Sequence, residues 1–389
     1  MHVDRAAGMT GFAPAEFEAR VARAQTRMQR LGLAALLLTT EPELRYFTGY
    51  LTRFWESPTR PWFLIVPASG KPVAVIPSIG AALMAQTWID DIRTWSAPDL
   101  IDDGVSLLAD TLSELTAEGD EIGCPDGHET HLRMPLADLR RLQSAIGTRK
   151  IVGDHGILRG LRMVKSDAEV AKIRAACQIS ARAFARVPEI ASAGTPLDQV
   201  FRRFQMLCLE EGADWVPYLA GGAEQGGYID VISPASQTPL RSGDVLMLDT
   251  GLVRDGYFCD YDRNWSVGPA SAPVRAAHSR LIEASDAAFE QARPGATASQ
   301  LFHTMNTILT DGGVGTDAGR LGHGLGMSLT EWPSLIPDDH TELEAGMVLT
   351  LEPGIAVNDK ILVHEENILI TDGAPEFLSP RIGPEIPEL

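Results

Sequence analysis

Four acidic residues in the second half of the chain stand in two pairs at matching positions, and carboxylates arranged in this way can hold metal ions. A shift of 103 residues superimposes two ten-residue stretches and places Asp249 on Glu352. A further slip of two residues, as expected for a longer second hairpin, places Asp260 on Glu365. Oxygen-rich clusters suit hard divalent cations. The acids therefore predict a metal-binding cradle built from an internal repeat.

The repeat extends upstream of the acids. A shift of 101 residues lays Gly194 on Gly295, together with short matching stretches nearby. Both copies also contain helix starts of the capping-box type, at Ser166 and at Thr297, in which the cap and a side chain three residues later satisfy exposed backbone amides. Each copy is expected to form two helices and then a strand hairpin, and the copies are expected to be related by a pseudo-twofold axis.

The hairpins should bring the acids of each pair together. Asp249 ends an apolar run, where an unpartnered charge is costly. With a turn at residues 254–255, Asp249 would lie directly across the hairpin from Asp260. In the second copy an Asn-Asp turn places Glu352 opposite Glu365 by the same count. Because adjacent carboxylates repel unless a proton or a metal lies between them, two such pairs favour a metal site over strand-end salt bridges.

One histidine has surroundings suited to a metal ligand. His323 lies in a Gly-His-Gly-Leu-Gly stretch, whose glycines allow close approach of backbone and ligand. The stretch lacks the Lys-Ser/Thr of a phosphate-binding loop. His364 is next to Glu365 and, by strand alternation, is expected to point to the opposite face. The remaining histidines have no acid in register and are expected to be solvated or satisfied in the core.

These motifs resemble those of the pita-bread metallopeptidase family. The matching residues are Asp249-x-Gly, Gly-Tyr-x-x-Asp260, His323-Gly-x-Gly, Glu352-Pro-Gly, and Glu365 followed by a second acid. The family includes Xaa-Pro dipeptidases (prolidases), Xaa-Pro aminopeptidases, methionine aminopeptidases and creatinases. The motifs fill all five ligand positions of the family.

The resemblance implies an α+β fold in two domains, and a chain of 389 residues is long enough for two cores. It covers about residues 160–380. Residues 156–389 are expected to form the C-terminal pseudo-twofold pita-bread catalytic domain. Residues 1–155 resemble the N-terminal α/β creatinase-like domain of the prolidase and creatinase branch, beginning with an amphipathic helix over 14–31.

The resemblance also implies a dinuclear centre. Asp249 and Asp260 would chelate one ion, His323 would bind the other, and Glu352 and Glu365 would take part in bridging. Manganese is the expected metal, with zinc, cobalt or iron as alternatives. A water or hydroxide between the two divalent ions would attack an amide or peptide carbonyl, with Glu352 as the catalytic residue that shuttles the proton.

The chain departs from the family where the family holds its peptide. Thr330 stands where peptidases have a second histidine, Val363 stands where they have arginine, and a substrate-facing histidine upstream of the first aspartate is absent. Thr330 remains a candidate substrate-binding residue. Asp262 replaces a threonine, and it either pairs with Arg263 or another base or belongs to the surroundings of the metals. We therefore expect Xaa-Pro dipeptides to be slow substrates.

The motifs and their departures from the family pattern leave three hypotheses about the function, two enzymatic and one non-catalytic. The first is a hydrolase resembling Xaa-Pro dipeptidase. The second is an enzyme of the same fold acting on a small non-peptide metabolite, either a creatinase- or ectoine-hydrolase-like amidohydrolase or a lyase of the dimethylsulfoniopropionate type. The third is a non-catalytic binding module, which the filled ligand positions disfavour.

The remaining features bound the partners of the protein. A net charge of −19 disfavours nucleic acid and anionic membranes, and no apolar run reaches the ~20 residues of a membrane helix. Four scattered cysteines without CxxC spacing indicate a reducing, cytoplasmic setting. By resemblance we expect a homodimer that binds a dipeptide or another small molecule. Trp55, in an aromatic and basic stretch, is a candidate for capping the substrate site, the alternative being a packed interdomain surface.

Overall fold

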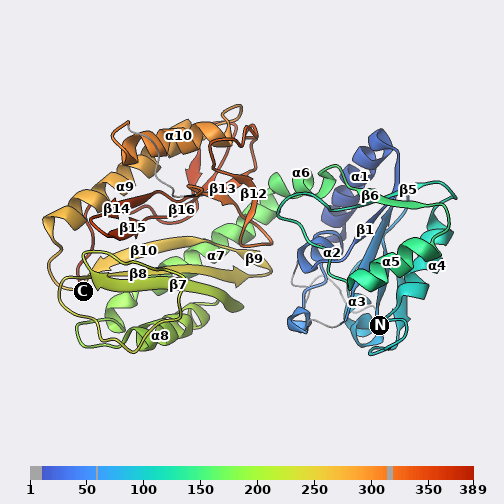
Figure 1. The fold of residues 1–389 in the computed structure, drawn as a ribbon, viewed down its shortest axis with the longest axis horizontal. Coiled ribbons are helices and arrows are strands. Elements are labelled where there is room, and N and C mark those ends of the chain that lie inside the picture. The colour runs from blue at the N-terminus through green and yellow to red at the C-terminus, as the bar shows by residue number, and fades with distance from the viewer. Residues whose placement is uncertain (1–10, 58–59, 313–318) are drawn as a thin grey trace. The chain divides into compact units, whose positions relative to one another are not determined.

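The protein divides into two compact units, Met1–Arg162 and Met163–Leu389 (Figure 1). The computed structural model describes residues 11–57, 60–312 and 319–389. The boundary between the units falls at 162/163, compared with the 155/156 expected from the sequence.

The N-terminal unit is built around a six-stranded mixed sheet with the strand order β4-β3-β2-β1-β5-β6. The strands are β1 Leu33–Leu38, β2 Phe63–Pro67, β3 Val73–Pro77, β4 Asp91–Trp95, β5 Glu121–Cys124 and β6 Lys150–Gly153. The helices are α1 Pro14–Leu31, α2 Glu41–Thr48, α3 Ala81–Met84, α4 Val105–Leu115, α5 Leu136–Ala145 and α6 Ile157–Met163, with 3-10 turns at Phe54–Glu56 and Ser78–Gly80. The helix predicted over 14–31 is confirmed, and Gly32 ends it in the left-handed conformation with φ 75°.

The C-terminal unit contains two runs of helix, helix and strands. The first run comprises α7 Asp167–Ala185, α8 Leu197–Glu210, β7 Trp215–Gln225, β8 Asp244–Arg254, β9 Tyr257–Phe258 and β10 Tyr261–Ser266, with a 3-10 turn at Val187–Glu189. The second run comprises α9 Ala272–Gln291, α10 Ala298–Leu309, β11 His323–Gly324, β12 Glu331–Ser334, β13 Val348–Leu351, β14 Gly354–Val357, β15 Lys360–Val363, β16 Glu366–Leu369 and β17 Glu376–Phe377. In Figure 1 the strands of this unit lie between α8 on one side and α9 and α10 on the other.

The predicted internal repeat is present in the hydrogen bonds as well as in the sequence. The Gly194 amide donates to the Leu240 carbonyl at 2.8 Å, and the Gly295 amide donates to the Leu343 carbonyl at 2.9 Å. These two bonds are related by the offsets of 101 and 103 residues seen in the sequence. The two halves therefore use the same backbone connections, as a pseudo-twofold arrangement requires.

A second repeated feature is a glycine in close contact with the strand that contains or directly precedes the first acid of each half. A Cβ added at Gly221 would lie 2.1 Å from the Met247 carbonyl oxygen, and one at Gly322 would lie 2.3 Å from the Thr350 carbonyl oxygen. Both glycines have positive φ angles, of 145° and 138°, which side chains disfavour. Each half therefore needs glycine for two backbones to meet behind the site.

The first hairpin has a different register from the one predicted. Its turn is Asp255-Gly256, with φ angles of 49° and 78°, the Asp-Gly dipeptide typical of a two-residue hairpin loop. Asp249 is consequently paired with Asp262, so the prediction that it faces Asp260 is wrong. The two hairpins have equal length, and the constant offset of 103 residues makes Asp262 the repeat mate of Glu365.

The second hairpin has the predicted register. The turn follows Val357, which pairs with Lys360, and Asn358 adopts a φ of 56°. Glu352 and Glu365 fall opposite each other, because Leu351 pairs with Glu366 and Gly354 pairs with Val363 on either side of them. Acids on the strands of both hairpins thus lie in one region of the C-terminal unit.

Candidate metal centre and substrate cavity

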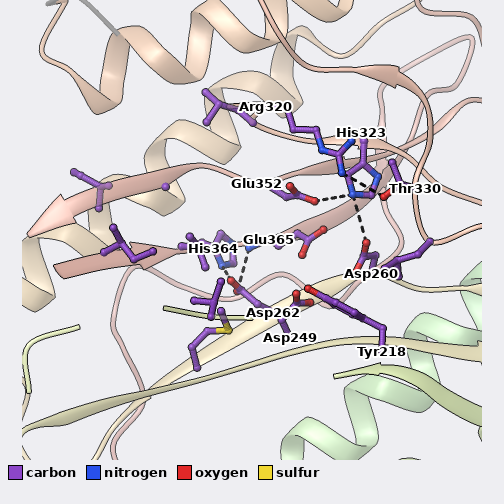
Figure 2. Close-up of a pocket in the computed structure, with 18 of the residues that line it drawn as sticks. Tyr218, Asp249, Asp260, Asp262, Arg320, His323, Thr330, Glu352, His364 and Glu365 are labelled. Atoms are coloured by element: carbon purple, nitrogen blue, oxygen red, sulfur yellow. Dashed lines mark hydrogen bonds and ion pairs between the residues drawn. The ribbon is translucent and has the colours of Figure 1, made fainter. Parts of the chain in front are cut away.

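A cavity of about 670 Å³ opens in the C-terminal unit, and the predicted acids lie on its floor. Figure 2 shows Arg320 and His323 on one side of the cavity and Asp249, Asp262 and Tyr218 on the other. The lining residues outside this polar floor are mainly apolar and include Val231, Leu329, Ile355, Ile361 and Val363. The cavity therefore combines a charged end with an apolar wall, as small-molecule sites commonly do.

Four of the five predicted ligands form one tight cluster. Each of Asp260, His323, Glu352 and Glu365 offers a donor atom, and these atoms all lie within 4.8 Å of one another. His323 Nε2 is 3.0 Å from a Glu352 oxygen and 3.5 Å from an Asp260 oxygen. One nitrogen and three carboxylates at this separation form a donor set suited to a divalent transition-metal ion such as manganese.

The orientation of His323 is set by its own backbone. Its Nδ1 is 2.8 Å from the Gly324 carbonyl oxygen, and since a carbonyl only accepts, Nδ1 carries the proton. Nε2 is thereby the ring nitrogen that faces the acids. This is the arrangement by which metal-binding histidines are usually oriented.

Thr350 connects the histidine with one of the acids. Its hydroxyl accepts a hydrogen bond from the His323 amide at 3.0 Å and donates to Glu352 at 2.8 Å. Burial alone would raise the pKa of Glu352, but the interaction with His323 and hydrogen bonds from His323, Glu365 and Thr350 outweigh it and lower this pKa to about 2. Glu352 is therefore ionised at neutral pH.

The fifth predicted ligand, Asp249, lines the same cavity but lies outside the four-residue cluster. Burial, and then the charges of Asp262 and Glu352, raise the pKa of Asp249 to about 8. Burial and neighbouring carboxylates also raise the pKa values of Asp260 and Glu365 well above their ordinary range. Without a cation, these neighbouring carboxyl groups must keep protons, because their charged forms repel one another. A metal cation could replace those protons, so the site is suited to a positively charged ligand.

Orphaned oxygen atoms support the same conclusion. Asp249 Oδ1, Asp262 Oδ2 and Glu365 Oε1 are buried and have no hydrogen-bond partner among the described residues. A buried carboxylate oxygen without a partner is costly. Divalent cations in the cavity would satisfy all three.

His364 does not point away from the site as predicted. It lines the cavity, with Nδ1 3.7 Å from Asp262 Oδ1 and Nε2 3.3 Å from a Glu366 oxygen. Strand alternation fails here because β15 ends at Val363 and β16 begins at Glu366, leaving His364 in the break between them.

Two polar residues of the cavity were missed by the sequence analysis. Arg320 is the one arginine or lysine among the described residues that line it, and its charge lowers the pKa of Asp260 against the stronger effects of burial and the neighbouring acids. Tyr218 lies close to Asp249, and burial together with that carboxylate raises the pKa of the phenol. The position of Arg320 three residues before His323 is a signal that could have drawn attention to it.

The two predicted substrate-binding residues, Thr330 and Trp55, lie in different units of the chain. Thr330 and Val363 both line the cavity, and the Thr330 hydroxyl accepts a hydrogen bond from Arg320 at 3.3 Å. Trp55 belongs to the N-terminal unit, where its ring packs against Trp62 and lies 5.0 Å from the Arg133 guanidinium. The role of Trp55 in capping substrate stays a prediction.

The sequence matches known families in both units. Residues 171–372 match metallopeptidase family M24, and residues 20–164 match the creatinase/prolidase N-terminal domain. A probable dipeptidase PepE from Mycobacterium bovis is 28% identical over 92% of this chain and 95% of its own. An Xaa-Pro dipeptidase from Pyrococcus horikoshii is 28% identical over 63% of this chain and 71% of its own.

Solved structures agree with the sequence matches. The crystal structure of dipeptidase PepE from Mycobacterium ulcerans has a TM-score of 0.83 and 29% identity, covering 97% of this chain and 99% of its own. The chain belongs to metallopeptidase family M24, since the family match covers more than half of it. The protein is therefore a metal-dependent hydrolase, and the predicted α+β pita-bread domain with a creatinase-like N-terminal domain is confirmed. No described helix has the length and apolar character needed to cross a membrane.

Proposed function

We propose that the protein is a dinuclear metallohydrolase that cleaves an amide or peptide bond in a short substrate, as a dipeptidase does. The observation that carries the proposal is the cluster of Asp260, His323, Glu352 and Glu365 at the floor of a substrate-sized cavity. Asp249, at the other end of the floor, completes the ligand set. The dipeptidase names of the relatives support the substrate class.

The residues of the chain divide the chemistry between them. Two divalent ions, with manganese expected first and zinc, cobalt or iron as alternatives, would supply a nucleophile at neutral pH and stabilise the developing oxyanion. Glu352 is ionised and faces the cavity, so it accepts the proton of the nucleophile and returns it to the leaving amine. Thr350 holds Glu352 in place for both transfers.

The cavity also indicates what the substrate looks like. Arg320 offers a cation to a substrate carboxylate, and Thr330 is held beside it by their hydrogen bond. The wall formed by Val231, Ile355 and Val363 is apolar. We therefore propose a compact, carboxylate-bearing substrate with an apolar portion, which a dipeptide satisfies.

A small non-peptide amide is the second candidate. It is favoured by the absence of histidine at 330 and of arginine at 363, because both departures remove donors from the cavity wall. Xaa-Pro dipeptides should be slow substrates for the same reason.

A substrate panel tests the proposal. Metal-free protein and protein reconstituted with manganese should be assayed on Xaa-Pro dipeptides, dipeptides without proline, creatine, ectoine and dimethylsulfoniopropionate. We expect metal-dependent hydrolysis, fastest on a dipeptide without proline. Hydrolysis of creatine or ectoine alone would select the second candidate, and full activity without metal would overturn the mechanism.

We also propose that the protein works as a cytoplasmic homodimer. The four cysteines are all buried and free, which suits a reducing compartment. In a dimer the segment around Trp55 could cap the cavity of the partner. Light scattering in solution measures the assembly, and a strictly monomeric active enzyme would contradict this proposal.

A further inference from the structure

The floor of the cavity contains an acid beyond the five predicted ligands. Asp262 lies on β10, is 1% exposed, and is directly paired with Asp249 across the hairpin. In the second half, Glu352 and Glu365 stand in the same cross-strand relation. Because the offset between the halves is 103 residues at both positions, Asp262 occupies the place in its half that the ligand Glu365 occupies in the other.

The two oxygens of Asp262 have different surroundings. Oδ1 accepts a hydrogen bond from the Glu365 amide at 3.1 Å and lies 3.7 Å from His364 Nδ1. Oδ2 is buried and has no partner among the residues that the structure describes, and the same holds for Asp249 Oδ1 and Glu365 Oε1. The cavity floor therefore has three unsatisfied carboxylate oxygens, one from each of these three acids.

A purely structural role for Asp262 would explain the surroundings of Oδ1 but not those of Oδ2. In that role Asp262 would serve as the partner of His364, whose other nitrogen faces Glu366, while Arg263 Nη2 pairs with Glu366 at 3.0 Å. This arrangement accounts for Oδ1. It leaves Oδ2 desolvated with no compensating contact. It also leaves the carboxyl groups of Asp249 and Asp262 directly opposite each other on paired strands, where they repel unless one of them keeps a proton.

We propose that Asp262 is a sixth protein ligand of the metal centre, binding through Oδ2 the ion that Asp249 holds. This inference rests on the proposed dinuclear function. The ion near His323 has the mixed cluster of one nitrogen and three carboxylates. The ion held by Asp249 and Asp262 is bound by oxygen alone, which favours a hard cation such as manganese or magnesium over softer metals.

The hydrogen bond from the Glu365 amide orients the carboxylate for this role. It fixes Oδ1 and leaves Oδ2 free, in the same way that an outer hydrogen bond orients other metal-binding carboxylates. A cation beside Oδ2 would give this buried oxygen the partner that it lacks among the described residues.

Manganese binding to metal-free protein tests the proposal with Asp262→Asn, which keeps the shape of the side chain and an acceptor for the Glu365 amide. The matched control is Glu366→Gln, which weakens the same His364 contact from its other end. Calorimetric titration gives the number and affinity of the ions. Electron paramagnetic resonance distinguishes a coupled manganese pair from a single ion, without any use of activity.

We expect two manganese ions per chain in the wild type and in Glu366→Gln. In Asp262→Asn one of the two should bind at least about 1,000-fold more weakly, beyond the roughly 10- to 100-fold loss usual for an outer residue, and the coupled signal should disappear. Asp262→Glu, which restores a carboxylate, should recover part of the binding. Circular dichroism checks that each variant is folded.

Other outcomes separate the failure of this inference from the failure of the proposed function. Equal losses in Asp262→Asn and Glu366→Gln would show that Asp262 acts only through His364, and two unchanged ions in Asp262→Asn would exclude it as a ligand. Either result overturns the inference and leaves the dinuclear function standing. A wild-type protein that binds no divalent ion would instead overturn the function itself.

Discussion

The carboxylates at the cavity floor repel one another unless a proton or a cation lies between them. Asp260 and Glu365 are buried and Asp249 is partly buried beside them. The pKa of each carboxyl is raised by burial first and by its neighbours second. Glu352 is the exception, because His323 and three hydrogen bonds keep it ionised. On this difference rests our proposal that Glu352 transfers the proton and that the group as a whole binds metal.

Glu352→Gln tests that assignment. We expect kcat to fall by at least about 10²-fold, because a carboxylate that can carry the proton is lost, while the circular dichroism spectrum of the metal-free protein remains close to wild type. Glu342→Gln, an exposed acid in the same half of the repeat, serves as the control and should keep full activity. A Glu352→Gln enzyme with ordinary turnover would show that another group moves the proton.

Substrate preference is a residue-scale property as well. Thr330 and Val363 line the cavity, at the positions where the sequence resemblance implies histidine and arginine. Each missing donor can cost about 2–4 kcal/mol of transition-state stabilisation. Thr330→His combined with Val363→Arg should raise kcat/KM on Xaa-Pro dipeptides above that of wild type and of either single variant. If the wild type already cleaves these dipeptides at rates ordinary for a metallopeptidase, other residues compensate and the inference about specificity is wrong.

At the scale of elements, two hairpins of equal length bring the acids together, and their registers decide which residues meet. Sequence spacing located the acids, His323 and the repeat. Sequence spacing misplaced the partner of Asp249, because the dipeptides Arg254-Asp255 and Asp255-Gly256 are both plausible hairpin turns. Only Asp255-Gly256 supplies two residues that adopt positive φ angles without strain. Sequence spacing also misplaced His364, because a break between two strands cannot be read from alternation.

Long-range contacts explain the other omissions. Arg320 reaches the acids from outside any strand or helix, so no periodicity marks it. The importance of Gly221 and Gly322 also depends on backbone that lies close only after folding.

Gly322→Ala tests the repeated glycine contact. The added Cβ would lie 2.3 Å from the Thr350 oxygen at a φ of 138°, so we expect the free energy of unfolding to fall by about 2–4 kcal/mol. Metal affinity should fall too, since Thr350 and His323 would be pushed apart. Gly373→Ala, where the nearest atom is 3.7 Å away, is the control. Denaturant unfolding of both variants measures the difference, and equal stabilities would contradict the steric argument.

At the scale of the whole molecule, stability depends on keeping buried groups in one protonation state. His278, on α9, is fully buried, and burial together with His364 lowers its pKa to about 4. Because the unfolded chain binds the proton first, near its ordinary pKa of about 6.5, the contribution of neutral His278 is complete above that pH. It is lost progressively as the pH falls from there through about 4.

Acid unfolding of His278→Gln checks this sign. The wild type should lose about 3 kcal/mol of stability between neutral pH and pH 4 through His278, and the variant should lose correspondingly less. His303→Gln replaces an exposed histidine on α10 and should follow the wild type. A variant with the same acid sensitivity as the wild type would show that His278 is not buried in its neutral form.

The centre joins the two halves of the C-terminal unit, since Asp249, Asp260 and Asp262 come from the first half and His323, Glu352 and Glu365 come from the second. Metal binding should therefore stabilise the unit as well as activate it.

The most direct measurement of the central claim is elemental analysis of protein purified without chelator, combined with activity during stepwise return of manganese to the metal-free form. We predict two divalent ions per chain and full hydrolysis only when both are bound. Full activity with no metal, or with a single ion per chain, would contradict the dinuclear mechanism.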